Sequence, residues 1–122
     1  MNIALWIAQI LLALAFGMAG TLKLTQPKPK LATNMGWVDD FSDSQVKLIG
    51  LAELLGAVGL ILPWALNIMP TLTPVAAVGL MITMMGAAYT HSRRGETSNI
   101  IPNLVLFALA AFVAWGRFTG AV

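Results

Sequence analysis

Residues 46–66 have the sequence VKLIGLAELLGAVGLILPWAL. It is apolar over about 20 residues, which is the length that an α-helix needs to cross a hydrocarbon core of about 30 Å. A buried helix of a soluble protein is usually shorter and keeps one polar face, which this stretch lacks. We therefore predict a transmembrane helix here, with a single acidic residue, Glu53, inside it.

Three further stretches of similar length and character lie at residues 3–24, 69–90 and 100–118. Hydrophobic residues make up 58% of the 122-residue chain and charged residues 10%, whereas soluble domains average about 45–50% and about 25%. The segments of alternating polarity that a membrane β-barrel needs are missing. The sequence thus predicts an all-α polytopic membrane protein, a four-transmembrane-helix bundle that forms a single domain over residues 1–122.

Composition also excludes several kinds of chemistry. The chain has no cysteine and one histidine, so it cannot build a thiolate zinc site or an iron–sulfur cluster by itself. We expect no metal site. Its net charge of +2 is too small for a nucleic-acid-binding surface. The sequence contains no self-contained catalytic motif, so whether the chain is an enzyme stays open, with a non-catalytic role favoured.

The longest connection, residues 25–45 (TQPKPKLATNMGWVDDFSDSQ), sets the layout of one end of the bundle. Pro27 and Pro29 are expected to stop the first helix, and Ser42 is placed to cap the second. Apolar residues alternate with charged ones between these points, which predicts a short interfacial segment. The apolar residues of this segment are Leu31, Met35, Trp37, Val38 and Phe41.

The positive charges predict the orientation. With four spans, the first and third loops share one side of the membrane, and both termini share the other. Six of the seven basic residues belong to the loop side: Lys23, Lys28, Lys30, Lys47, Arg93 and Arg94. Only Arg117 belongs to the side of the termini, so the positive-inside rule predicts cytoplasmic loops and external termini. Trp6, Trp64 and Trp115 then fall at the outer interface, as an aromatic belt would.

Glu53 is the most informative residue, because an unpaired carboxylate at its depth costs about 2.5–3.5 kcal/mol on insertion scales. It lies about 10 Å below the end of its helix by the helical rise. Small residues stand one turn away on either side, at Gly50 and Gly56, and Gly59 follows. Small residues let membrane helices approach closely, so Gly50, Gly56 and Gly59 are predicted to form a helix-packing face together with Gly20 of the first span.

Each of the other spans carries one polar residue near the level of Glu53: Lys23, His91 and Asn103. We expect Lys23, Glu53, His91 and Asn103 to converge in the cytoplasmic half of the bundle. Two interpretations stay open. Either the cluster binds a ligand, or its members are structural. In the structural interpretation Lys23 pairs with Glu53 or snorkels to the interface, His91 is an interfacial or loop residue, and Asn103 makes a helix-start or interhelical hydrogen bond.

These residues together resemble the DoxX-like family of small bacterial four-span membrane proteins. The resemblance rests on four motifs: GTLKL with Gly20 and Lys23, IGLAELLGAVGLILP with Glu53 and Pro63, AAYTHSRRGE with His91, and NLVLFALAAFVAWGRF with Asn103 and Arg117. The family is similar to a subunit of a thiosulfate:quinone oxidoreductase. The resemblance implies a bundle in the bacterial cytoplasmic (inner) membrane and a quinone or redox partner, and it supplies no catalytic motif.

Two functional hypotheses follow. In the first, the chain is an accessory or binding subunit that holds a hydrophobic small molecule, with a quinone as the candidate, through the polar cluster. Glu53 and His91 would then donate hydrogen bonds or protons to the head group. In the second, the chain is a structural or assembly protein, or a homo-oligomer, in which the Glu53–Lys23 pair only fixes helix packing. Its partners are the lipid bilayer and either another membrane protein subunit or a second copy of itself.

Overall fold

The computed structural model describes residues 2–32 and 36–120, and these residues form helices joined by short turns. In chain order the elements are α1 (Asn2–Thr25), α2 (Lys28–Leu31), the 3-10 helix η1 (Gly36–Asp40), α3 (Asp43–Ala65), α4 (Leu72–Arg93) and α5 (Thr97–Thr119). No strand occurs in the described ranges. The all-α prediction with four long helices is therefore confirmed.

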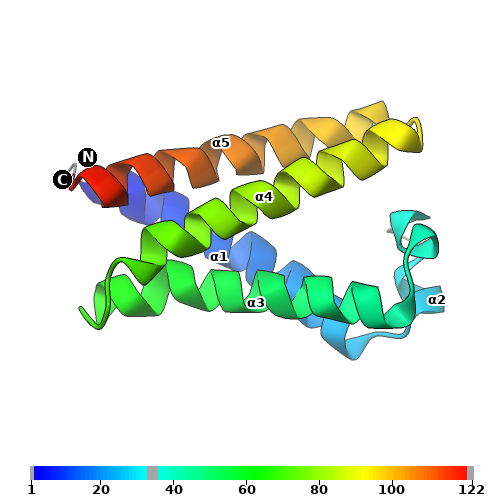
Figure 1. Ribbon diagram of the computed structural model, residues 1–122, viewed down its shortest axis with the longest axis horizontal. Coiled ribbons are helices and arrows are strands. Elements are labelled where there is room, and N and C mark those ends of the chain that lie inside the picture. Colours follow the sequence, from blue (N-terminus) through cyan, green and yellow to red (C-terminus); the bar gives the residue numbers. More distant parts are fainter. Residues whose placement is uncertain (1, 33–35, 121–122) are drawn as a thin grey trace.

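The four long helices run along the molecule and alternate in direction (Figure 1). α1 packs mainly against α3, and α4 packs mainly against α5. α3 against α4 and α1 against α5 close the bundle. Both termini and the α3–α4 turn lie at one end, here called the terminal end. α2, η1 and the α4–α5 turn lie at the other, here called the loop end.

Local chemistry explains where the helices begin and stop. Ser42 caps α3 in a reciprocal capping box: its Oγ accepts from the Gln45 amide at 3.1 Å, and Gln45 Oε1 accepts from the Ser42 amide at 2.9 Å. The predicted cap is confirmed, and α3 therefore starts at Asp43, earlier than the expected residue 46. The expected third loop, residues 91–99, is shorter than predicted, because α4 continues to Arg93 and α5 begins at Thr97.

The core follows the axis of the bundle. Leu12 and Phe16 of α1 meet Leu60 of α3, Leu80 of α4 and Val113 of α5, and all five side chains are buried. A second, smaller core lies at the loop end, where Leu31 and Val38 pack on Val46. Apolar residues of the first loop thus pack onto the first turn of α3, where their side chains and Val46 are removed from solvent together. Met35, which the sequence groups with them, lies outside the described residues.

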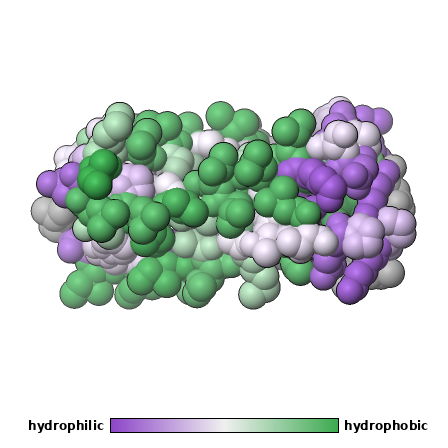
Figure 2. Space-filling view, turned by 90° about the horizontal axis from the view of Figure 1, so that it is seen from below, coloured by the Kyte–Doolittle hydropathy of each residue, from purple (hydrophilic) through white to green (hydrophobic). Residues whose placement is uncertain are grey.

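The outer surface of the bundle is apolar. Large hydrophobic side chains are exposed along all four long helices, for example Leu14, Leu55, Ile82 and Leu104. Figure 2 shows hydrophobic residues around the middle of the molecule and hydrophilic residues gathered most densely at the loop end. Each long helix is long and apolar enough to cross a membrane. The bundle is therefore an integral membrane protein whose exposed surface contacts lipid.

Candidate functional site

A buried ion pair joins α1 to α3 near the loop end. Lys23 Nζ donates to Glu53 Oε1 at 2.6 Å, and the two side chains are only 5% and 4% exposed. A charge-assisted hydrogen bond of this length is strong. Each charge would be costly alone in a lipid-embedded bundle, so each stabilises the other.

Two glycines make this ion pair geometrically accessible. A Cβ atom on Gly20 would lie 2.6 Å from the Gly50 carbonyl oxygen, and one on Gly50 would lie 2.7 Å from Lys23 Cβ. α1 and α3 therefore cross at a distance that only glycine permits. The crossing brings Lys23 beside α3, within reach of Glu53. Further along α3, Gly56 faces Leu80 and Gly59 faces Ala76, so these two glycines lie against α4.

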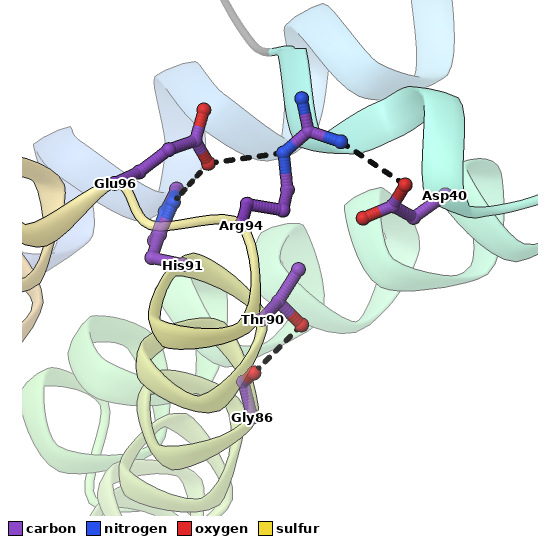
Figure 3. Close-up of polar contacts among 6 residues, drawn as sticks. All are labelled: Asp40, Gly86, Thr90, His91, Arg94 and Glu96. Carbon is purple, nitrogen blue, oxygen red and sulfur yellow. Dashed lines mark hydrogen bonds and ion pairs between the residues drawn. The ribbon is translucent and has the colours of Figure 1, made fainter.

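His91 belongs to a different set of contacts, which links the α4–α5 turn to η1 (Figure 3). His91 Nδ1 donates to Glu96 Oε1 at 3.0 Å, because a carboxylate can only accept. Arg94 Nε donates to the same oxygen at 3.1 Å, and Arg94 Nη1 donates to Asp40 Oδ1 at 3.0 Å. We call these four residues, Asp40, His91, Arg94 and Glu96, the clasp.

The clasp has a definite electrostatic character. The hydrogen bond from His91, together with the nearby Arg94 charge, lowers the pKa of Glu96 below its ordinary value of 4.5. The hydrogen bond to Asp40 raises the pKa of Arg94. Glu96 is thus an anion held between two donors, and Arg94 is a cation held between two carboxylates. The arrangement ties η1 to the α4–α5 turn at neutral pH.

Beside the clasp, a cavity of about 920 Å³ opens between η1, α3 and α4. We call it the chamber. Trp37, Phe41 and Ile49 give it apolar walls, and apart from Thr83 its polar lining residues come from η1 and from the last turns of α4 and its C-cap. The polar and charged lining residues are Asp40, Thr83, Tyr89, Thr90, Arg93 and Arg94. An apolar cavity with a few polar groups on one side is the usual form of a small-molecule site.

One aromatic residue connects the chamber to the buried ion pair. The Trp37 ring lines the chamber, and Lys23 Nζ lies 5.5 Å from the centre of the same ring. That distance is within the range of a cation–π contact. A molecule that stacks on Trp37 inside the chamber would therefore be separated from the Lys23–Glu53 pair by a single side chain.

A family model for the DoxX-like family matches residues 7–113, which is most of the chain. The chain belongs to the DoxX-like family. No curated protein and no solved structure matches it. The matched range includes both residues of the ion pair and every residue that lines the chamber.

The DoxX-like chain brings together two of the four predicted site residues. Lys23 and Glu53 form the ion pair, whereas His91 joins the clasp through Glu96. Asn103 lies on α5, and its Nδ2 is buried without a hydrogen-bond partner among the described residues. The sequence could indicate a common depth for these residues, but it could not fix the rotation of each helix.

The DoxX-like chain has a second buried polar cluster, at the terminal end, that sequence reasoning missed. Arg117 Nε donates to Gln9 Oε1 at 2.7 Å, and Arg117 Nη1 donates to Asn2 Oδ1 at 2.9 Å. Gln9 Nε2 donates to the Leu60 carbonyl at 2.6 Å. The guanidinium also lies 4.3 Å from the Trp64 ring centre and 5.6 Å from that of Trp6.

This cluster buries a cation without a carboxylate. Arg117 is 4% exposed and makes no ion pair within the part of the chain that the structure describes. Amide oxygens and two indole rings compensate its charge instead. The available signal was Gln9, a strongly polar residue inside the first apolar stretch, at the same end of the bundle as Arg117.

Proposed function

We propose that this DoxX-like protein is an accessory or binding subunit that holds a hydrophobic small molecule with a polar head in the chamber. The observation that carries the proposal is the chamber itself, about 920 Å³ with apolar walls and a polar side, next to a buried ion pair. The polar cluster expected from the sequence is thereby refined. Lys23, paired with Glu53, contacts Trp37, which lines the chamber. His91 does not line the chamber and contributes by holding Glu96 in the clasp.

A quinone fits the donor set. Quinone carbonyls accept hydrogen bonds, and six lining residues carry side-chain N–H or O–H groups: Trp37, Thr83, Tyr89, Thr90, Arg93 and Arg94. The rings of Trp37 and Phe41 offer faces for stacking. The residues of the chain would bind and orient such a head group, while electrons would come from a redox partner protein.

We further propose that the protein lies in the bacterial cytoplasmic membrane with its loop end inside the cell. The excess of basic residues at the loop end supports this orientation. Arg117, the basic residue of the terminal end, is buried by Gln9, Asn2 and two tryptophans. It is therefore little exposed to lipid head groups, and the difference in accessible positive charge between the two ends becomes larger.

The binding proposal is tested by titrating the purified protein in mild detergent with a benzoquinone that carries a single isoprenoid unit. Quenching of Trp37 fluorescence, isolated by comparison with a Trp37→Phe variant, should saturate. Gly86→Leu fills the chamber, since a Cβ at Gly86 meets nothing within 4 Å, and should abolish saturation. Ala108→Leu, at an exposed position on α5, should not. Linear, collisional quenching in the wild-type protein, as in Gly86→Leu and Ala108→Leu, would overturn the proposal.

A second candidate function, structural assembly, is favoured by one observation. The Lys23–Glu53 pair sits at the Gly20–Gly50 crossing, where an ion pair also fixes the register of two helices. Glu53→Gln and Lys23→Met lower the amount of folded protein under either function, and the double variant partly restores it. If the pair is only structural, neither single change alters quinone binding by the protein that does fold.

A further inference from the structure

The chamber continues into a second hollow that runs along the bundle. This hollow, about 530 Å³, lies between α3 and α4 and extends from Thr83 toward Pro63 and Leu72. We call it the groove. Thr83 lines both the chamber and the groove, so the two meet at this residue. The distance along α4 from Thr83 to Leu72 is about 16 Å by the helical rise.

The two hollows differ in chemistry. Asp40, Arg93 and Arg94 give the chamber its charged side. The groove is lined by apolar residues and glycines apart from Thr83, whose hydroxyl donates to the Gly79 carbonyl of its own helix at 3.0 Å. The groove thus presents almost no polar atom to an occupant.

The sequence of α4 explains why the hollows are continuous. Ala76, Gly79, Thr83 and Gly86 follow one another at helical spacing, so they lie on one face of α4. A Cβ atom on Gly79 or Gly86 would meet nothing within 4 Å. Because Gly79 and Gly86 carry no side chain, the space beside them stays open. Gly56 and Gly59 of α3, in contrast, are already in close contact with α4.

From this continuity we infer that the ligand of the chamber is long-tailed: its head occupies the chamber and its isoprenoid or alkyl tail lies in the groove. The inference rests on the proposed function and names the class of molecule, a single-headed amphiphile with an extended apolar tail. Lipid tails are as apolar as the groove, so the groove adds packing contacts and orientation instead of a hydrophobic driving force.

The test compares two probes, the benzoquinone with a single isoprenoid unit and the same head group with a long isoprenoid tail. In the wild-type protein the long-tailed probe should bind more tightly. Gly79→Leu, which fills the groove, should weaken the long-tailed probe about tenfold and leave the short one unchanged. Val58→Phe narrows the groove from α3 and serves if Gly79→Leu does not fold. Ala108→Leu is the matched control.

The outcomes separate the inference from the proposal beneath it. Equal affinity of the two probes, or no effect of either groove variant on the long-tailed probe, would overturn the inference and leave head-group binding intact. Loss of a co-purified phospholipid from Gly79→Leu with unchanged quinone affinity would likewise overturn it. If neither probe binds the wild-type protein saturably, the proposed function fails and the inference fails with it.

Discussion

At the residue scale, the central feature is a pair of opposite charges that lie together inside an apolar bundle. Lys23 and Glu53 are each nearly inaccessible, with side chains only 5% and 4% exposed. Removing one partner leaves the other as an uncompensated buried charge, which typically costs about 3–5 kcal/mol. Replacing both removes the problem, so the two positions must be strongly coupled.

Glu53→Gln and Lys23→Met should therefore each destabilise the protein by about 3–5 kcal/mol, and the double variant should be less destabilised than the sum of the two. The measurement is thermal unfolding in a fixed detergent, followed by circular dichroism. Lys28→Met, a charge change at the same end of the bundle, controls for net charge. Simple additivity of the two single effects would show that the pair is not coupled.

The clasp predicts a dependence on acid. Because the pKa of folded Glu96 is lowered below 4.5, the contribution of Glu96 to holding the clasp is complete above pH 4.5 and is lost as the pH falls through the lowered value. His91 and Arg94 contact Glu96 directly, and Asp40 is linked to it through Arg94. Trp37 fluorescence, isolated against Trp37→Phe, should change in that acid range. Glu96→Gln should remove this transition, and its persistence in the variant would assign the transition to another group.

The sequence was sufficient to propose Lys23 as a partner for Glu53, because both lie on small-residue faces at one depth. It was not sufficient for His91, whose partner Glu96 comes from the turn after α4, a segment too short for periodicity to describe. Arg117 served in the sequence only as a sign of orientation, because only the fold shows that Gln9 and Asn2 reach it from α1.

At the element scale, glycines decide which helix pairs touch and which leave space. Gly20 and Gly50 allow the close α1–α3 crossing, whereas Gly79 and Gly86 of α4 face the open groove and chamber. The same residue type thus has opposite roles on two helices. Hydrophobic patterning predicts the helices well, but a glycine in a sequence looks the same whether it is packed or exposed to a cavity.

This contrast gives a paired prediction. Gly20→Ala places a methyl group 2.6 Å from the Gly50 carbonyl oxygen and 2.8 Å from the Leu54 amide nitrogen, both backbone atoms that cannot rotate away. The helices must separate, so we expect a loss of about 1–3 kcal/mol and a weakened Lys23–Glu53 pair. Gly79→Ala should be neutral or stabilising, because alanine favours helix by up to about 1 kcal/mol over glycine.

Thermal unfolding of the two alanine variants side by side is the check. Equal stability of Gly20→Ala and Gly79→Ala would contradict the close crossing.

The ends of the helices are also set by local chemistry. The Ser42 cap was predicted from the sequence, while its capping box with Gln45 and the extension of α4 to Arg93 were not, because polar residues in a last helical turn look like a loop.

At the scale of the whole molecule, the two ends differ. The loop end gathers the charged clasp, the chamber and two short helices, and the terminal end has a basic residue enclosed among amides and indoles. Four apolar stretches were enough to predict the bundle. The groove and the chamber could not be predicted from the sequence, because a cavity depends on the distance between two helices along their whole length.

The asymmetry predicts which end faces the cytoplasm. The chain has no cysteine, so single cysteines at exposed Thr71 and Ser98 report on the terminal and loop ends respectively. In intact spheroplasts, a membrane-impermeant maleimide should label Thr71→Cys and should label Ser98→Cys only after the membrane is opened. The reverse pattern would place the loop end outside the cell.

We propose above that this DoxX-like bundle holds an amphiphilic small molecule beside its buried ion pair. Native mass spectrometry of the protein, purified from its membrane in mild detergent, tests this most directly. We predict one bound molecule of a quinone or a similar long-tailed amphiphile, lost in Gly86→Leu and reduced in a folded Glu53→Gln variant. A protein that retains no such molecule and carries only a second copy or another protein subunit would contradict the claim and favour structural assembly.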